Sequence, residues 1–200
     1  MEFVEPTTRL YEDNPLLEEF TARALRVIAR GFFRVAVILD KTAFYPGGRG
    51  QSCDHGVIWT PRGRVNINMV YADKGGVIIH EGKLSGRVRS GDEVSCRIDW
   101  HRRLAIMKIN TAALAVIAAL RKLLKRDLVV KDVTVESIGR TKCKGTLHVY
   151  GSLKGCRRED VERLVNEILG RNLKLTVSKL TAEEARSRVD VPADVDEYLK

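Results

Sequence analysis

The sequence predicts an α+β fold in two parts: a small β-barrel-like domain over residues 1–99 that contains a glycine-rich motif, and an α+β domain over residues 100–200. In the first part, short apolar segments are separated by turns that contain Gly and Pro, which is typical of a small barrel or sandwich. In the second part, a long stretch without Gly or Pro precedes a further strand pattern and a second helical pattern. We expect a buried core helix on a mostly antiparallel sheet. The two parts either fold separately or share one core.

Short strands account for the first part. Residues 33–39 form a mostly apolar run of the kind found in strands covered on both faces. Turn signals follow at Pro46-Gly47-Gly48, Pro61-Arg62-Gly63, Lys74-Gly75-Gly76 and Ser90-Gly91-Asp92. Between them we expect strands over residues 65–70, 77–80 and 94–98.

The second part begins with a long predicted helix over residues 102–126. Its apolar side chains recur at helical spacings and surround the centre of the helix, a pattern that favours burial. The elements expected after it are a strand over residues 129–136, a helix over residues 158–169 with Gly170 as its C-cap, and a strand over residues 173–180. Thr181 is expected to cap a short helix with Glu184 at the capping-box position, and residues 191–200 to be weakly ordered.

The composition excludes several classes of protein. With 44% hydrophobic and 30% charged residues over 200 positions, the chain has the balance of an ordinary soluble globular protein. The acidic start lacks the apolar segment of a signal peptide, and the longest largely apolar run, residues 109–120, is too short to span a bilayer. We therefore expect a cytoplasmic protein without a membrane partner.

Basic residues outnumber acidic ones by 35 to 26, which gives a net charge of +9. Such an excess favours a polyanionic partner, RNA, DNA or an anionic surface, through contacts with phosphate. The solvated surface of a hyperthermophile protein explains it equally well, since Gln51 is the only glutamine. Both interpretations remain open at the level of composition.

The cysteines and histidines show no ready-made site. Cys53, Cys96, Cys143 and Cys156 include no C-x-x-C pair, which excludes a zinc ribbon. We expect buried free thiols, and the sequence leaves open a disulfide between Cys53 and Cys96. His80 lies in a predicted strand and is expected to be a hydrogen-bonded structural histidine.

The segment Thr42–Gln51 is the most distinctive in the chain. Gly47, Gly48 and Gly50, together with Pro46, let the backbone turn sharply and approach another group closely. The segment matches neither the Walker pattern nor the dinucleotide-binding glycine pattern. A structural turn between two strands also accounts for it.

This segment, Phe44-Tyr45-Pro46-Gly47-Gly48-Arg49-Gly50-Gln51, resembles the glycine-rich motif of the alanyl-tRNA synthetase editing module and of its free-standing AlaX-type relatives. The order of later motifs agrees: His80-Glu81-Gly82, Gly91-Asp92-Glu93-Val94, Ile98-Asp99-Trp100 and Cys143-Lys144-Gly145-Thr146. The resemblance implies a β-barrel-like part joined to an editing domain. It also implies hydrolysis of the seryl or glycyl ester of mischarged tRNA specific for alanine.

The family's zinc site is degenerate in this sequence. The family holds zinc with two His four residues apart on a helix and with Cys and His four residues apart on a strand, and these positions are Asn110, Leu114, Cys143 and Leu147 here. Asn is a poor zinc ligand and Leu cannot bind zinc. His148 is no substitute, because in a regular strand it points away from the face of Cys143.

The resemblance therefore implies a vestigial site made of Asn110, Thr111, Leu114, Cys143 and Leu147, with no metal and no cofactor. We expect Leu114 to be largely buried. Thr111 either lines a pocket for the amino-acid end of a substrate or bonds back to its own helix.

A basic strand face is predicted further along the chain. Arg140, Lys142 and Lys144 share it with His148 and Tyr150, a composition that favours RNA contact with Tyr150 available for base stacking. A plain solvated sheet face accounts for these residues equally well.

The function expected from these features is a tRNA- or RNA-binding, non-catalytic homologue. The first alternative is a trans-editing hydrolase that deacylates mischarged Ser- or Gly-tRNA specific for alanine without a metal. The second is an interaction protein that forms a homo-oligomer or pairs with an active paralogue.

Overall fold

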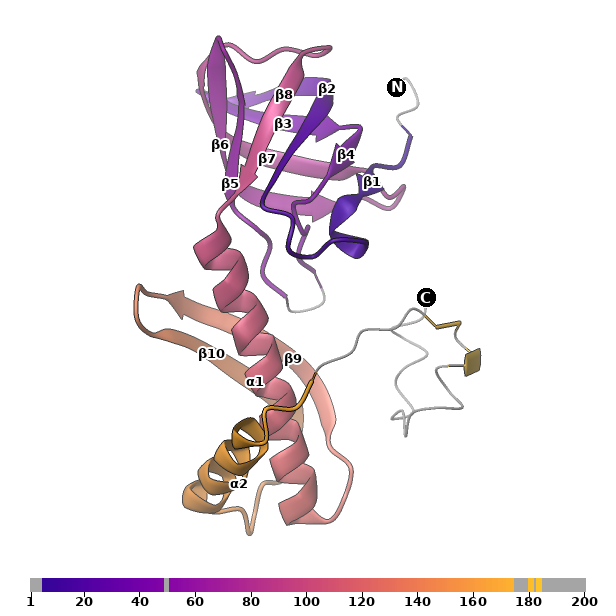
Figure 1. The fold of residues 1–200 in the computed structure, drawn as a ribbon. Helices are drawn as coiled ribbons and strands as arrows, with labels where there is room; N and C mark the ends of the chain where they lie inside the picture. Colours follow the sequence, from indigo (N-terminus) through magenta and orange to yellow (C-terminus); the bar gives the residue numbers. More distant parts are fainter. Residues whose placement is uncertain (1–4, 49–50, 175–179, 182, 185–200) are drawn as a thin grey trace. The chain divides into compact units, whose positions relative to one another are not determined.

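The structure is a computed structural model that describes residues 5–48, 51–174, 180–181 and 183–184. The predicted α+β class is confirmed, since the described residues form a closed antiparallel barrel, two small sheets and two α-helices (Figure 1). The chain divides into two compact units, Met1–Ile109 with Asp132–Thr146, and Asn110–Lys131 with Leu147–Lys200. The boundary at residue 100 stays a prediction.

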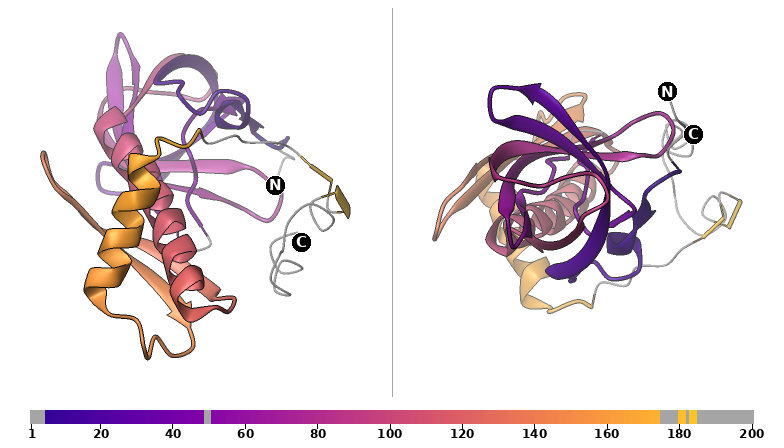
Figure 2. Two further views of the ribbon diagram at one scale, coloured as in Figure 1. Left: turned by 60° about the horizontal axis from the view of Figure 1, so that its bottom comes forward. Right: turned by 90° about the horizontal axis from the view of Figure 1, so that it is seen from above.

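The barrel closes through six strands. Their order around the barrel is β2 (Glu19–Gly31), β3 (Arg34–Leu39), β7 (Ile78–Gly86), β6 (Gly63–Ala72), β5 (Gly56–Thr60) and β8 (Glu93–Ile98). The ring is completed where β2 pairs with β8, with Glu19 opposite Arg97. The view from above in Figure 2 shows these strands curving round on themselves.

Two short strands and one turn of 3-10 helix adjoin the barrel. β1 (Thr8–Arg9) pairs in parallel with β4 (Lys41–Thr42), and the 3-10 turn η1 (Leu10–Glu12) follows β1 directly. Beyond β4 the chain enters the glycine-rich segment.

The barrel interior is apolar, with His80 as its main polar member. Alternate residues of the strands fill it, including Val35, Val37, Leu39, Ile58, Val65, Ile78 and Val94. The Nδ1 of His80 donates to the Val37 carbonyl oxygen at 3.0 Å, and Nε2 accepts from the Thr42 hydroxyl at 2.9 Å. Burial lowers the pKa of His80 to about 4, so the ring is neutral. The prediction of a hydrogen-bonded structural histidine is confirmed.

The long helix α1 (Trp100–Leu124) is partly buried. Its buried apolar side chains are small or branched, namely Ala105, Ile106, Ala113, Ala115, Ala119 and Leu120. Thr111, Leu114 and Ala118 lie on the exposed face, and Leu114 is 59% exposed. The prediction that Leu114 is largely buried is therefore wrong. The centre of the helix is apolar on all sides, so its periodicity does not identify the packed face.

By length and composition alone, α1 is also able to cross a membrane, the one such helix among the described residues. The core helix of a water-soluble protein passes the same test, so this property assigns no location. The shortness of the apolar run at residues 109–120 therefore does not exclude a membrane-spanning helix, because the whole of α1 meets the criteria of length and composition.

The remaining described elements are a hairpin and a second helix. β9 (Val129–Ile138) and β10 (Cys143–Tyr150) form a two-stranded sheet, and α2 (Arg158–Gly170) buries Leu164. Gly170 is the last residue of α2 and not its C-cap, a correction to the prediction. Arg171 caps the helix, and Asn172 takes the left-handed conformation with φ of +48°. Asn tolerates this conformation better than most residues other than Gly.

The last sequence predictions meet the described residues only in part. Residues 175–179 of the predicted strand and residues 191–200 lie outside them. Thr181 and Glu184 are described and make the reciprocal bonds of a capping box: the Thr181 N–H donates to Glu184 Oε2 at 2.9 Å, and the Glu184 N–H donates to Thr181 Oγ1 at 3.2 Å. The capping-box bonds are therefore confirmed, while most of the short helix expected after them lies outside the described residues.

Candidate functional site

The glycine-rich segment forms a tight loop between β4 and β5. Gly48 and Gln51 exchange backbone hydrogen bonds of 3.0 Å in both directions, and the Tyr45 hydroxyl donates to Gln51 Oε1 at 2.6 Å. Gly47 has φ of +65°, and a Cβ there would lie 2.8 Å from the backbone nitrogen of Cys53. Only glycine therefore fits at this position. Arg49 and Gly50 lie outside the described residues.

Asp54 closes the base of the loop. The Tyr45 N–H donates to Asp54 Oδ2 at 2.6 Å, and the Asp54 N–H donates to the Tyr45 carbonyl oxygen at 3.1 Å. The carboxylate is buried, so it needs a positive partner. Arg103, from the first turn of α1, supplies that partner.

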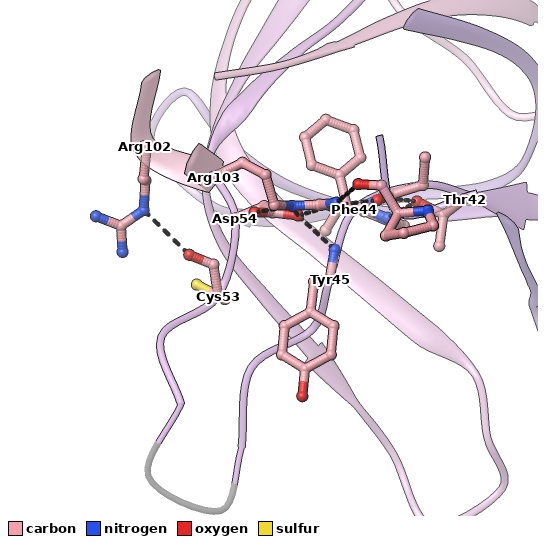
Figure 3. Close-up of polar contacts among 10 residues, drawn as sticks. Thr42, Phe44, Tyr45, Cys53, Asp54, Arg102 and Arg103 are labelled. Atoms are coloured by element: carbon pink, nitrogen blue, oxygen red, sulfur yellow. Dashed lines mark hydrogen bonds and ion pairs between the residues drawn. The ribbon is translucent and has the colours of Figure 1, made fainter. Parts of the chain in front are cut away.

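The guanidinium of Arg103 connects three segments of the chain. Its Nε lies 2.9 Å and 3.0 Å from the two Asp54 carboxylate oxygens, and its Nη2 also donates to Asp54. Nη1 donates to the Pro15 carbonyl oxygen at 2.8 Å and Nη2 to the Ala43 carbonyl oxygen at 2.7 Å. A buried ion pair needs such further bonds to offset its desolvation. Figure 3 shows Arg103 reaching Asp54 from the helix, with Tyr45 directed away from the pair.

Weaker contacts support the outer side of the loop. The Nε of Arg102 donates to the Cys53 carbonyl oxygen at 3.0 Å. The Tyr45 ring packs edge-on against Tyr11 with ring centroids 5.4 Å apart, and burial raises the pKa of Tyr11. The loop is thus held at both ends, and it presents the Tyr45 hydroxyl and the Gln51 side chain beside a glycine-only backbone.

Sequence reasoning identified the glycines and Gln51 but missed Asp54 and Arg103 as the anchors of the loop. These two residues are 49 positions apart, and neither belongs to a local pattern that indicates pairing. The one signal in the sequence was an arginine, Arg103, on a helix whose buried positions are otherwise apolar.

The other predicted site residues lie on α1 and β10. Thr111 and Leu114 are exposed on α1 and Asn110 is half-buried, while on β10 Cys143 is exposed and Leu147 is half-buried. All four cysteines are free thiols, and Cys53 and Cys96 form no disulfide. The expectation of buried thiols is confirmed for Cys96 and wrong for Cys143.

The predicted basic strand face is shorter than expected. Because β10 begins at Cys143, Arg140 and Lys142 lie in the connection before it and not on the strand. Lys144, His148 and Tyr150 share one face of β10, and Lys144 and Tyr150 are exposed. The Lys144 Nζ lies 2.5 Å from Glu136 Oε2, which offsets part of its charge.

Comparison with known proteins shows similarity to tRNA synthetases, and to alanine–tRNA ligases in particular. Residues 11–102 match the family model for class II (A) tRNA synthetases. The alanine–tRNA ligase of Pyrococcus abyssi is 34% identical over 186 residues, 92% of this chain and 19% of the ligase. The ligase of Ignicoccus hospitalis is 35% identical over 187 residues, 92% of this chain and 19% of the ligase. That of Acidothermus cellulolyticus is 35% identical over 155 residues, 76% of this chain and 17% of the ligase.

The chain belongs to the alanyl-tRNA synthetase superfamily. The resemblance found in the sequence is confirmed at this level. This member of the superfamily spans about a fifth of the length of the ligases it matches.

The residues that the sequence resemblance places at the zinc positions of the editing module are a poor set of zinc ligands. Of Asn110, Leu114, Cys143 and Leu147, only Cys143 carries an atom that binds zinc well. Within the described part of the chain, no group of three or more His, Cys, Asp or Glu side chains is arranged to hold a metal ion.

Proposed function

We propose that this chain is an AlaX-like member of the superfamily that has lost its zinc centre and binds tRNA without hydrolysing the aminoacyl ester. The observation that carries the proposal is the contrast between two sites. The glycine-rich loop is anchored through Asp54 and Arg103. Three of the four zinc positions, in contrast, have no ligand atom suited to zinc. A role on tRNA fits a cytoplasmic location.

Charge supports RNA as the partner. The chain carries a net charge of +9, and Arg140, Lys142 and Lys144 are all exposed. Tyr150, also exposed, offers a ring on which an unpaired base stacks. These residues supply phosphate contacts and one stacking surface.

A metal-independent deacylase is the second candidate, and the geometry of the loop favours it. A loop anchored at Tyr45 and Asp54 is suited to holding the amino-acid end of a charged tRNA, and an aminoacyl ester is already activated toward water. Thr111 is exposed on α1, so its hydroxyl is accessible to orient a water molecule. Little further barrier reduction is needed for slow hydrolysis.

One assay distinguishes the candidates. Ser-, Gly- and Ala-charged tRNA specific for alanine are incubated with the protein, with and without a chelator, while binding is titrated in parallel. Binding without hydrolysis is the expected result. Hydrolysis that a chelator does not slow supports the deacylase, and chelator-sensitive hydrolysis with stoichiometric zinc contradicts both candidates. Light scattering on the pure protein tests for a homo-oligomer, and a titration with a paralogue tests for pairing.

A further inference from the structure

We propose that the outer face of the barrel binds a single-stranded RNA segment, with Trp59 at one end of the contact surface and Phe32 and Phe33 at the other. The inference rests on RNA as the partner in the proposed function. It assigns a surface that shares no residue with the glycine-rich loop or with β10. All of its residues belong to the compact unit that contains the barrel.

A basic groove that contains a tryptophan lies at the turn between β5 and β6. Its volume is about 680 Å³, and Trp59 lies in it together with Arg62, Arg64 and Arg97. The Arg97 guanidinium lies 5.7 Å from the centre of the Trp59 ring. An aromatic ring that shares a groove with three guanidinium groups is suited to stacking a base and binding its phosphate.

The charge of this groove distinguishes it from the second groove on the barrel. The lining of the first includes three arginines and no acidic residue. The second, of about 490 Å³, places Arg23 and Lys41 beside Asp40 and Glu93, so its charges cancel. Of these two grooves, the first is therefore the one that attracts a polyanion.

The arginines of the first groove keep most of their capacity to bind phosphate. Arg97 pairs with Glu19 at 2.6 Å and Arg62 pairs with Asp92 at 3.0 Å, yet both arginine side chains remain more than half exposed. Arg64 is exposed and makes no ion pair within the described part of the chain. Exposed pairs of this kind are weak, so a phosphate displaces them at little cost.

The pairing register extends this basic surface around the barrel. One residue from each of five neighbouring strands, β8, β5, β6, β7 and β3, is paired with the next. These residues are Arg97, Val57, Asn66, Lys83 and Arg34. Residues paired in this way point to the same face of a sheet, and Asn66, Lys83 and Arg34 are exposed. Four strand spacings of about 4.8 Å give the row a length of about 19 Å, enough for several nucleotides.

An exposed aromatic pair ends the row. Phe32 and Phe33 form the turn between β2 and β3, directly before Arg34, and are 93% and 66% exposed. Their ring centroids lie 5.5 Å apart in an edge-to-face arrangement. Phe33 has φ of +57°, which is unusual for a bulky residue, and its carbonyl oxygen accepts a bond of 2.8 Å from the Leu84 N–H. The backbone thus holds two large rings in water next to Arg34, where they are accessible to the bases of an RNA.

Fluorescence titration tests the proposal directly. In a Trp100→Phe chain, Trp59 is the only tryptophan, and a 12-nucleotide oligouridine is added as the probe. We expect quenching of Trp59 as a base stacks on it. Phe32→Ser/Phe33→Ser should weaken binding roughly 5- to 150-fold, the range that loss of one stacked base gives. Arg64→Glu/Lys83→Glu should also weaken binding and reduce its salt dependence. The matched control, Arg23→Glu/Lys74→Glu, changes the same charge outside the row and should weaken binding far less.

The outcomes separate this inference from the proposed function. Equal affinity in the row variant and the control variant overturns the inference. Binding of tRNA without any binding of the oligouridine also overturns it, while the proposed function stands. Dimerisation that Phe32→Ser/Phe33→Ser abolishes, without RNA binding, makes this face a protein interface and overturns it as well.

Discussion

His80 makes the stability of the barrel depend on pH. Burial keeps its pKa at about 4 in the folded protein, against 6.5 when the ring is in water. Between these values the unfolded chain binds more protons than the folded one, so acid favours unfolding. The contribution of His80 to the free energy of unfolding should be fully present above pH 6.5. Below this pH the free energy of unfolding should fall by up to about 1.4 kcal/mol per pH unit toward pH 4.

Urea unfolding at several pH values measures this dependence. His80→Gln should be less stable than the wild type at pH 7, but its stability should change less between pH 6.5 and 4. His101→Gln, at an exposed position, is the control and should keep the wild-type profile. Parallel profiles for wild type and His80→Gln would show that this ring does not cause the dependence.

The ion pair of Asp54 and Arg103 should contribute more to stability than any exposed pair. Asp54→Asn leaves the Arg103 guanidinium buried without a carboxylate, which costs about 3 to 5 kcal/mol. Arg102→Gln removes one bond from a half-buried side chain and should cost about 1 kcal/mol. Denaturant unfolding compares the two variants. Similar losses would contradict the role of Arg103 as the anchor of the loop.

At the scale of elements, a variant of α1 and β10 tests whether the backbone still holds the proposed zinc positions in a geometry that binds zinc. Asn110→His, Leu114→His and Leu147→His together restore the ligand types beside Cys143. We expect no zinc to remain bound after gel filtration, because metal-bound His needs polar groups that orient it. The helix neighbours of Leu114 at three or four positions are Asn110, Thr111, Ile117 and Ala118, with no carboxylate among them. Stoichiometric zinc in elemental analysis would show an intact scaffold.

Elements differ in how well the sequence predicts them. The strand β3 is readily predicted because Val35, Val37 and Leu39 fill the barrel interior. The strand β2 was not predicted, since register shifts at Ala24/Arg26 and Ala29/Gly31 break its alternation and its outer face carries arginines. Pairing with β3 and β8 determines β2, and such long-range pairing leaves no local pattern.

Some residues of the candidate site were predictable from the sequence and others were not. Glycines at the loop were predictable, because a positive φ at Gly47 demands this residue type locally. The anchors Asp54 and Arg103 were not, since their contact is made only in the folded chain. The exposure of Leu114 was mispredicted because apolar side chains surround α1, and most of its buried apolar positions are alanines.

At the scale of the whole molecule, the charge of +9 predicts salt-dependent tRNA binding. Arg140→Glu/Lys142→Glu/Lys144→Glu should weaken binding and reduce the log–log salt slope by about 0.7 to 0.9 for each phosphate that these side chains neutralise. A tRNA titration at several salt concentrations measures the slope, and a thermal melt checks folding. Arg23→Glu/Lys74→Glu/Lys131→Glu is the matched control. An unchanged slope in the folded variant would leave these residues as solvated surface.

The closure of the barrel by β2 and β8 also governs how the chain folds. Glu19 and Arg97, which meet at this closure, are 78 positions apart, and Arg103 bonds to Pro15 across 88 positions. Contacts of such long range require a large loss of chain entropy before they form, which slows folding to the range of milliseconds to seconds. On the ribosome the barrel stays open until β8 has emerged. Until then its apolar interior is exposed, and a chaperone or an early partner has access to it.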